Sequence, residues 1–218
     1  MPETFLTKLG APAMVAGGVA NVVFWLLAAT IGSFVGASAA LNPLWNVSQA
    51  LHVAAAAMGA LGLVTIYAAY QARLGVLGLI SFVIAFLGAL CYFADGVIAL
   101  AIFPAVAKAA PPLLATDGAF NAPPVMFAFI AFSAISMIGY VAMSWALHRA
   151  RLLPAPALAL LTTGAILSNL PPGPVPAQVI QIGSILFGLG GVWIGFALAP
   201  SRLSAERLNP NVESLLGG

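Results

Sequence analysis

The sequence consists of long apolar stretches separated by a few short polar segments. No Asp, Glu, Lys or Arg occurs between Lys8 and Arg73, and further uncharged windows cover residues 74–94, 118–147 and 152–201. A transmembrane helix needs about 20 predominantly apolar residues, whereas a transmembrane β-strand alternates apolar and polar positions. Each window is long enough for one or two helices, and none alternates. The pattern therefore predicts an all-α, polytopic membrane protein.

Clusters of proline, asparagine and glycine divide these windows into individual helices. The first window breaks at residues 41–46 and the last at residues 170–174, which read Leu-Pro-Pro-Gly-Pro. We therefore expect a single bundle of six transmembrane helices over residues 1–200, followed by a short cytoplasmic tail, residues 201–218. The expected spans are 12–36, 47–70, 75–103, 124–147, 154–169 and 177–199. The first is too long for the apolar core of a signal peptide, so we expect a true span there.

Positive charges gather on one side of this topology. Cytoplasmic loops of membrane proteins carry an excess of Lys and Arg. If the N-terminus is cytoplasmic, Lys108 alone lies outside, and the other basic residues share the inner side: Lys8, Arg73, Arg149, Arg151, Arg202 and Arg207. We therefore expect both termini in the cytoplasm. The Ala- and Pro-rich composition is typical of GC-rich bacterial genomes, which indicates a bacterial inner membrane.

Composition and motifs exclude several function classes. With 62% hydrophobic and 6% charged residues, the chain is not a soluble enzyme or a nucleic-acid-binding module. Its single cysteine, Cys91, excludes an intramolecular disulfide and a C-x-x-C redox pair. No H-E-x-x-H motif and no glycine-rich phosphate loop with a lysine occur. We therefore expect no enzyme activity, no catalytic residues, no metal site and no required cofactor.

Ionisable groups inside a span are costly in hydrocarbon and are functional candidates by default. Asp95 is the only acid within a span, and His52 is the only imidazole. His52 precedes Arg73 by 21 residues and Asp95 follows it by 22, which places both roughly 32 Å from this turn. Two interpretations stay open: a proton- or cation-binding site, or a buried pair that only locks two helices together. His52 is also a possible ligand for haem or for the magnesium of chlorophyll.

Other residues are suited to helix packing. Asn21 lies near the middle of the first span, where its amide can form a hydrogen bond to a neighbouring helix. Gly32 and Gly36 form a G-x-x-x-G pair in the first span, and Gly191 and Gly195 form another in the last. Such pairs let helix backbones approach closely, either within the bundle or against another chain.

Three function hypotheses follow from these observations. The leading one is a non-catalytic accessory or assembly subunit of a larger membrane complex, because catalytic motifs and soluble domains are missing and small-residue faces are abundant. The second is a small transporter or channel that uses Asp95 and His52. The third is a pigment- or lipophilic-ligand-binding protein with His52 as the ligand. The expected partners are the lipid bilayer and other membrane subunits, and the outer segment 104–123 is either a cap or a docking segment.

Overall fold

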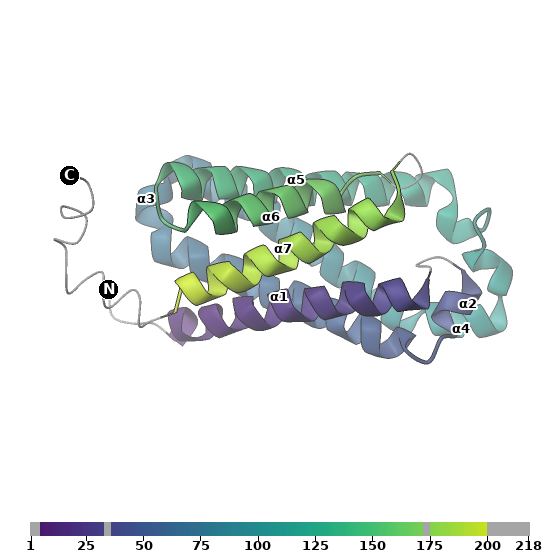
Figure 1. Ribbon diagram of the computed structural model, residues 1–218. Coiled ribbons are helices and arrows are strands. Elements are labelled where there is room, and N and C mark those ends of the chain that lie inside the picture. The colour runs from purple at the N-terminus through teal and green to yellow at the C-terminus, as the bar shows by residue number, and fades with distance from the viewer. Residues whose placement is uncertain (1–4, 33–35, 172–174, 200–218) are drawn as a thin grey trace.

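The protein is a bundle of apolar helices. The structure, a computed structural model, describes residues 5–32, 36–171 and 175–199, so the expected tail 201–218 lies outside it. Nearly all of the described residues are helical, and none forms part of an extended strand. Four helical stretches are long and apolar enough to cross a membrane, namely 8–31, 45–109, 123–149 and 177–197. The expected membrane-type helical bundle is therefore present (Figure 1).

Helix α1 (Phe5–Ile31) begins and ends earlier than the expected span 12–36. Gly32 stops it: this residue has a φ of +80°, which a residue with a side chain rarely adopts, and its amide donates to the Ala28 carbonyl at 3.2 Å. Gly36 also lies beyond the helix, with a φ of +104°. The prediction of a packing face at Gly32 and Gly36 is therefore wrong for α1, since a Cβ at Gly32 would meet nothing within 4 Å. The short helix α2 (Ala37–Ala40) follows.

Helix α3 (Trp45–Ala101) is a hairpin of two antiparallel arms. Its backbone leaves the helical conformation at Gly75, where φ is +60° and ψ is −154°. The indole Nε1 of Trp45 donates to the Ala99 carbonyl at 2.9 Å, and the rings of Tyr67 and Phe82 stack at 4.6 Å. Trp45 is only 2% exposed, so it ties the open end of the hairpin together. Each arm, 45–74 and 76–101, exceeds the length needed to cross the hydrocarbon.

The segment after α3 folds over the open end of this hairpin. It contains α4 (Phe103–Ala109) and two 3-10 helices, η1 (Pro111–Leu114) and η2 (Ala119–Asn121). An apolar cluster joins this segment to α2 and to both ends of α3; its buried members are Ala39, Ala40, Trp45, Ala99, Ala107 and Leu114. The expected outer segment 104–123 therefore forms a cap over one end of the bundle (Figure 1).

Three further helices complete the bundle. They are α5 (Pro123–Arg149), α6 (Ala155–Ser168) and α7 (Ala177–Ala197), and their bounds lie within two residues of the expected spans. Helix α6 has 14 residues and is therefore about 21 Å long, which is shorter than the hydrocarbon core of a bilayer. Helix α7 crosses the bundle between α1 and α6 (Figure 1).

Glycines bring α1 close to α3 on one side and to α7 on the other. A Cβ added at Gly17 would lie 3.2 Å from the Gly59 amide nitrogen on α3. A Cβ added at Gly18 would lie 2.5 Å from the Gly188 carbonyl oxygen and 2.8 Å from the Val192 amide nitrogen, both on α7. Because those neighbours are backbone atoms, they cannot move aside as a flexible side chain can. The position of α1 depends on these small residues.

We predict that Gly18→Ala lowers the stability of the bundle by about 1–3 kcal/mol, the usual cost of overpacking a tight contact. Gly59→Ala is the matched control, because a Cβ at this helical glycine meets nothing within 4 Å. Alanine there is expected to leave stability unchanged or to raise it by about 0.5–1 kcal/mol. Thermal unfolding of the purified variants in one detergent makes the comparison. Equal unfolding midpoints for the two variants would contradict the packing described above.

Candidate functional site

Polar side chains from five helical segments meet at one level of the bundle. Three contacts between helices connect them: the Asn21 amide donates to the Ser184 carbonyl at 2.7 Å, the rings of His52 and Tyr92 lie 6.0 Å apart, and the Tyr92 hydroxyl donates to Asn169 Oδ1 at 2.7 Å. Helix α6 joins α7 at the same level, since a Cβ at Gly183 would lie 2.6 Å from the Ser168 amide nitrogen. We call this set the polar layer; its members are Asn21, His52, Tyr92, Asp95, Ser168, Asn169 and Ser184.

His52 lies in the interior of the bundle. Only 9% of the residue is exposed, and its ring stacks on Phe24 of α1 at a centroid distance of 4.6 Å. Its Nδ1 lies 3.4 Å from Oε1 of Gln49, which is one turn earlier in α3 and is also buried. A Cβ at Gly96 on the opposite arm would lie 3.4 Å from the imidazole Cγ. The imidazole is therefore enclosed between α1 and both arms of α3.

Asp95 faces a different side of the same hairpin. It is half-buried and borders a small cavity of about 30 Å³ between the second arm of α3 and α5, which is room for one water molecule. Cys91 and Tyr92 border the cavity from α3. Ser133 borders it from α5 together with Phe129 and Phe132, two residues that are 39% and 43% exposed. The carboxyl group therefore lies at an opening on the outer surface of the bundle.

The hairpin brings His52 and Asp95 to one level but not into contact. His52 contacts Tyr92, whose ring stands between it and the cavity that Asp95 borders. Within the described residues, Asp95 makes no ion pair and accepts no hydrogen bond. The nearly equal number of residues between Arg73 and each of the two side chains gives their shared level along the hairpin. Residue counting does not give the rotation of each arm about its axis, and this rotation points the two side chains to different sides.

The remaining residues singled out from the sequence pack inside the bundle. Asn21 forms its interhelical hydrogen bond with α7, as described above. A Cβ at Gly195 would lie 2.6 Å from a methyl group of Val15 and 2.8 Å from its amide nitrogen, and a Cβ at Gly191 would lie 3.8 Å from Gly18 Cα. The glycine face of α7 therefore packs against α1 of the same chain.

Sequence reasoning missed Tyr92, Gln49 and Asn169. Tyr92 follows Arg73 by 19 residues, so the arithmetic that relates His52 to Asp95 also places Tyr92 near their level. Asn169 lies two residues before the proline run that ends the fifth expected span, and its amide Nδ2 donates to the Ala165 carbonyl at 2.7 Å. This bond fixes the amide so that its oxygen faces the Tyr92 hydroxyl.

Neither a metal centre nor a known relative accounts for the polar layer. No group of three or more His, Cys, Asp or Glu side chains in the described part of the chain is arranged to hold a metal ion. Comparison of the chain with protein-family models, with curated proteins and with solved structures finds no match. The function must therefore be argued from the geometry of the site.

We predict that Tyr92→Phe destabilises the bundle by about 0.6 kcal/mol, and by no more than about 1.7 kcal/mol, the range measured for hydrogen bonds between membrane helices. The substitution removes the hydroxyl that donates to Asn169 and leaves the ring in place. Tyr67→Phe is the matched control, because the Tyr67 ring stacks on Phe82 while its hydroxyl makes no hydrogen bond within the described residues. Unfolding of both variants in mixed detergent micelles gives the two values. A larger loss of stability in Tyr67→Phe than in Tyr92→Phe would contradict this description of the polar layer.

Proposed function

We propose that this chain is a non-catalytic integral subunit or assembly partner of a larger membrane complex. In this proposal the chain crosses a bacterial inner membrane six times, with both termini in the cytoplasm. The turn at Gly75 supports the count, because it divides α3 into two arms that are each long enough to span. The distribution of Lys and Arg supports the orientation. Helix α6 is the least regular span, because its 14 residues cover only part of the hydrocarbon thickness.

One observation carries the proposal: Asp95 opens to the outside of the bundle without a partner in the described chain. Placing an acid within a membrane helix costs about 3 kcal/mol at the bilayer centre and less toward the interface, and membrane proteins normally compensate that cost with a paired group. His52 is turned away from the carboxyl, and Tyr92 donates its hydroxyl hydrogen to Asn169 instead. A hydrogen-bond donor from a neighbouring membrane helix is the compensation that this geometry favours.

The surface around Asp95 is also suited to contact with another helix. The exposed rings of Phe129 and Phe132 flank the opening, and Cys91 lies one helical turn from the carboxyl on the same arm. Aromatic side chains are enriched in the cores of protein interfaces. The small-residue faces of α1 and α7 pack on each other, so they offer no comparable surface to a partner.

A transporter is the second candidate, and the polar layer favours it, because buried polar groups in a membrane commonly mark ion or proton paths. A path must continue to the other side of the membrane. Below the layer the core consists mainly of large apolar side chains that are fully buried, and its buried polar groups are small hydroxyls such as those of Ser81 and Ser144. The apolar members include Leu63, Ile66, Met143, Leu147 and Ile194. This closed core makes transport the weaker proposal.

Pigment binding through His52 is the third candidate. The imidazole would have to bind the metal of a large planar cofactor. One face of its ring already stacks on Phe24, and the residue is 9% exposed. This packing leaves pigment binding with less support than the other two proposals.

We predict that the chain, purified from its own host in mild detergent, carries integral membrane proteins in fixed stoichiometry, and that Asp95→Leu reduces their amount at least tenfold. Asp95→Asn retains part of the interaction, because an amide still forms hydrogen bonds. Asp117→Asn is the control, since this acid lies in the cap between η1 and η2, outside the membrane helices. Quantitative mass spectrometry of the co-purified proteins measures the effect.

Two outcomes would contradict the subunit proposal. Either the wild-type chain is recovered alone, or its partners remain in full amount with Asp95→Leu. In both cases a proton-flux assay in reconstituted vesicles decides whether transport replaces it. Flux that is present in the wild-type chain and lost in Asp95→Asn would establish the second candidate.

A further inference from the structure

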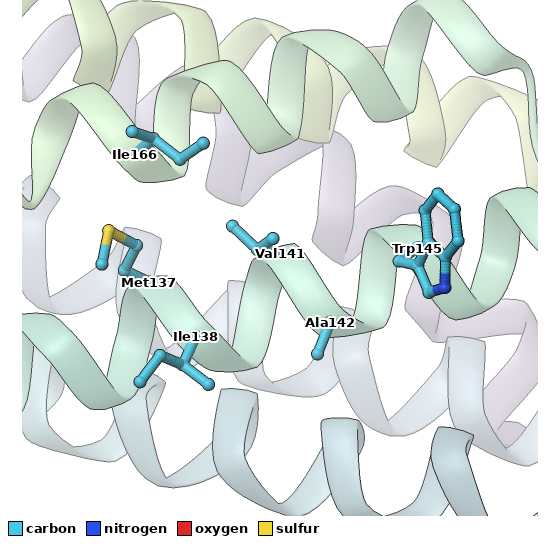
Figure 2. Close-up of a pocket in the computed structure, with 6 residues that line it drawn as sticks. All are labelled: Met137, Ile138, Val141, Ala142, Trp145 and Ile166. Carbon is cyan, nitrogen blue, oxygen red and sulfur yellow. The ribbon is translucent and has the colours of Figure 1, made fainter.

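A groove on the lipid-facing surface separates α5 from α6. It has a volume of about 620 Å³, and all of its lining residues are apolar: Met137, Ile138, Val141, Ala142, Trp145 and Ile166. Figure 2 shows Met137 and Val141 on α5 and Ile166 on α6 at the two sides of the gap, with Trp145 farther along α5. Because α6 is short, it borders α5 over only part of the length of α5.

Basic side chains lie at the end of the groove that Trp145 marks. Arg149 follows Trp145 by four residues and Val141 by eight, so all three share one face of α5. His148 lies beside Trp145, with the two rings 6.4 Å apart. Arg73, from the turn of the α3 hairpin, donates through Nη2 to the Ala150 carbonyl at 2.9 Å, which brings a further cation to this end.

Arg151 is held at the same end in a costly backbone conformation. Its φ is +51°, and it is the only residue other than glycine in the described chain with a positive φ. It follows the end of α5, where the Leu152 amide donates to the Leu147 carbonyl at 3.1 Å and glycine is the preferred residue. The left-handed backbone conformation costs an arginine about 1–2 kcal/mol of conformational free energy, which a glycine would not lose. The fold therefore retains a cation at a position that favours glycine.

These cations have no acidic counterpart nearby in the described chain. The described acids are Asp95 and Asp117, and both lie toward the opposite end of the bundle. Basic pockets between membrane helices on the cytoplasmic side typically bind anionic lipid head groups. The apolar groove, together with cations that no acid of the described chain approaches, therefore matches a molecule with an apolar chain and an anionic head.

We propose that the groove between α5 and α6 binds one anionic phospholipid, with an acyl chain against Val141 and the head group at Arg149 and Arg151. Dimensions support this assignment. From Met137 to Arg149 the helix rises about 18 Å, close to half of the roughly 30 Å hydrocarbon core, so the site extends over one leaflet. The head-group end of the site, at Arg149 and Arg151, lies toward the opposite end of α5 from Ser133, which borders the Asp95 cavity. The proposal does not depend on a protein partner at Asp95.

The test uses the purified full-length chain in mild detergent with equal amounts of phosphatidylglycerol and phosphatidylcholine of identical acyl chains. Native mass spectrometry counts the lipid that each chain retains. We expect one phosphatidylglycerol per chain, retained in preference to phosphatidylcholine. Arg149→Gln and Arg151→Gly should each weaken retention about fivefold, the effect of removing one basic residue near an anionic head group. Lys108→Gln, in α4 of the cap, is the charge control and should have no effect.

A second pair of variants separates the groove from the charges. Val141→Trp fills the groove and should abolish retention, although both arginines remain. Val76→Trp is the matched control, because Val76 is 73% exposed on the second arm of α3 and lies outside the groove. Arg151→Gly should keep or raise the unfolding temperature, so that its loss of lipid is not a loss of fold.

Three results would overturn the proposal. One is equal retention of the two lipids, and another is unchanged retention in Val141→Trp. The third is a dimer of the wild-type chain that Val141→Trp dissociates, since the occupant of the groove would then be a second copy of the protein.

Discussion

The close approach of α1 to α3 and α7 through glycine is the constraint on which the rest of the bundle depends. Lipid tails are as apolar as the helix surfaces, so association of helices in a membrane relies on packing and hydrogen bonds rather than on burial from water. Gly17 and Gly18 face opposite neighbours, and backbone atoms of both neighbours lie where larger side chains would extend. This packing places Phe24 against His52 and Asn21 against the Ser184 carbonyl.

The polar layer is a consequence of that arrangement and of the hairpin turn at Gly75. Once α1 and the two arms of α3 are fixed, the Tyr92 hydroxyl donates to Asn169 at the end of α6, and the Asn21 amide donates to the Ser184 carbonyl on α7. Asp95 takes no part in these two hydrogen bonds. Its carboxyl borders a small cavity between α3 and α5, and this position is the observation on which the subunit proposal rests.

Much of this fold could be predicted from the sequence, because charged residues, prolines and glycines mark the ends of the helices. Arg73 with Gly75 marks the hairpin, and the pairs Arg149–Arg151 and Pro171–Pro172 delimit the fifth span. Gly32 was misread, because glycine serves both in helix contacts and in helix ends, and a single sequence does not separate these uses. For the site, the sequence predicts only the depth of His52 and Asp95 in the bundle, which follows from residue counting. The direction in which each side chain points depends on helix rotation, and this is set by packing against α1 and α5. Tyr92 and Asn169 were overlooked because a hydroxyl and an amide gain importance only when another helix presents a partner.

The central claim is that another protein covers the opening at Asp95, and native Cys91 reports on it most directly because it borders the same cavity. The measurement is the rate at which a small, lipid-soluble thiol reagent modifies Cys91 in native membranes and in the purified chain. A Cys91→Ser, Val23→Cys variant serves as the reference, since Val23 is 37% exposed on α1, away from the cavity. The account predicts that Cys91 reacts at least tenfold more slowly in native membranes than in the purified chain, after both rates are divided by the rate at position 23 in the same preparation. Equal relative rates in the two preparations would contradict it.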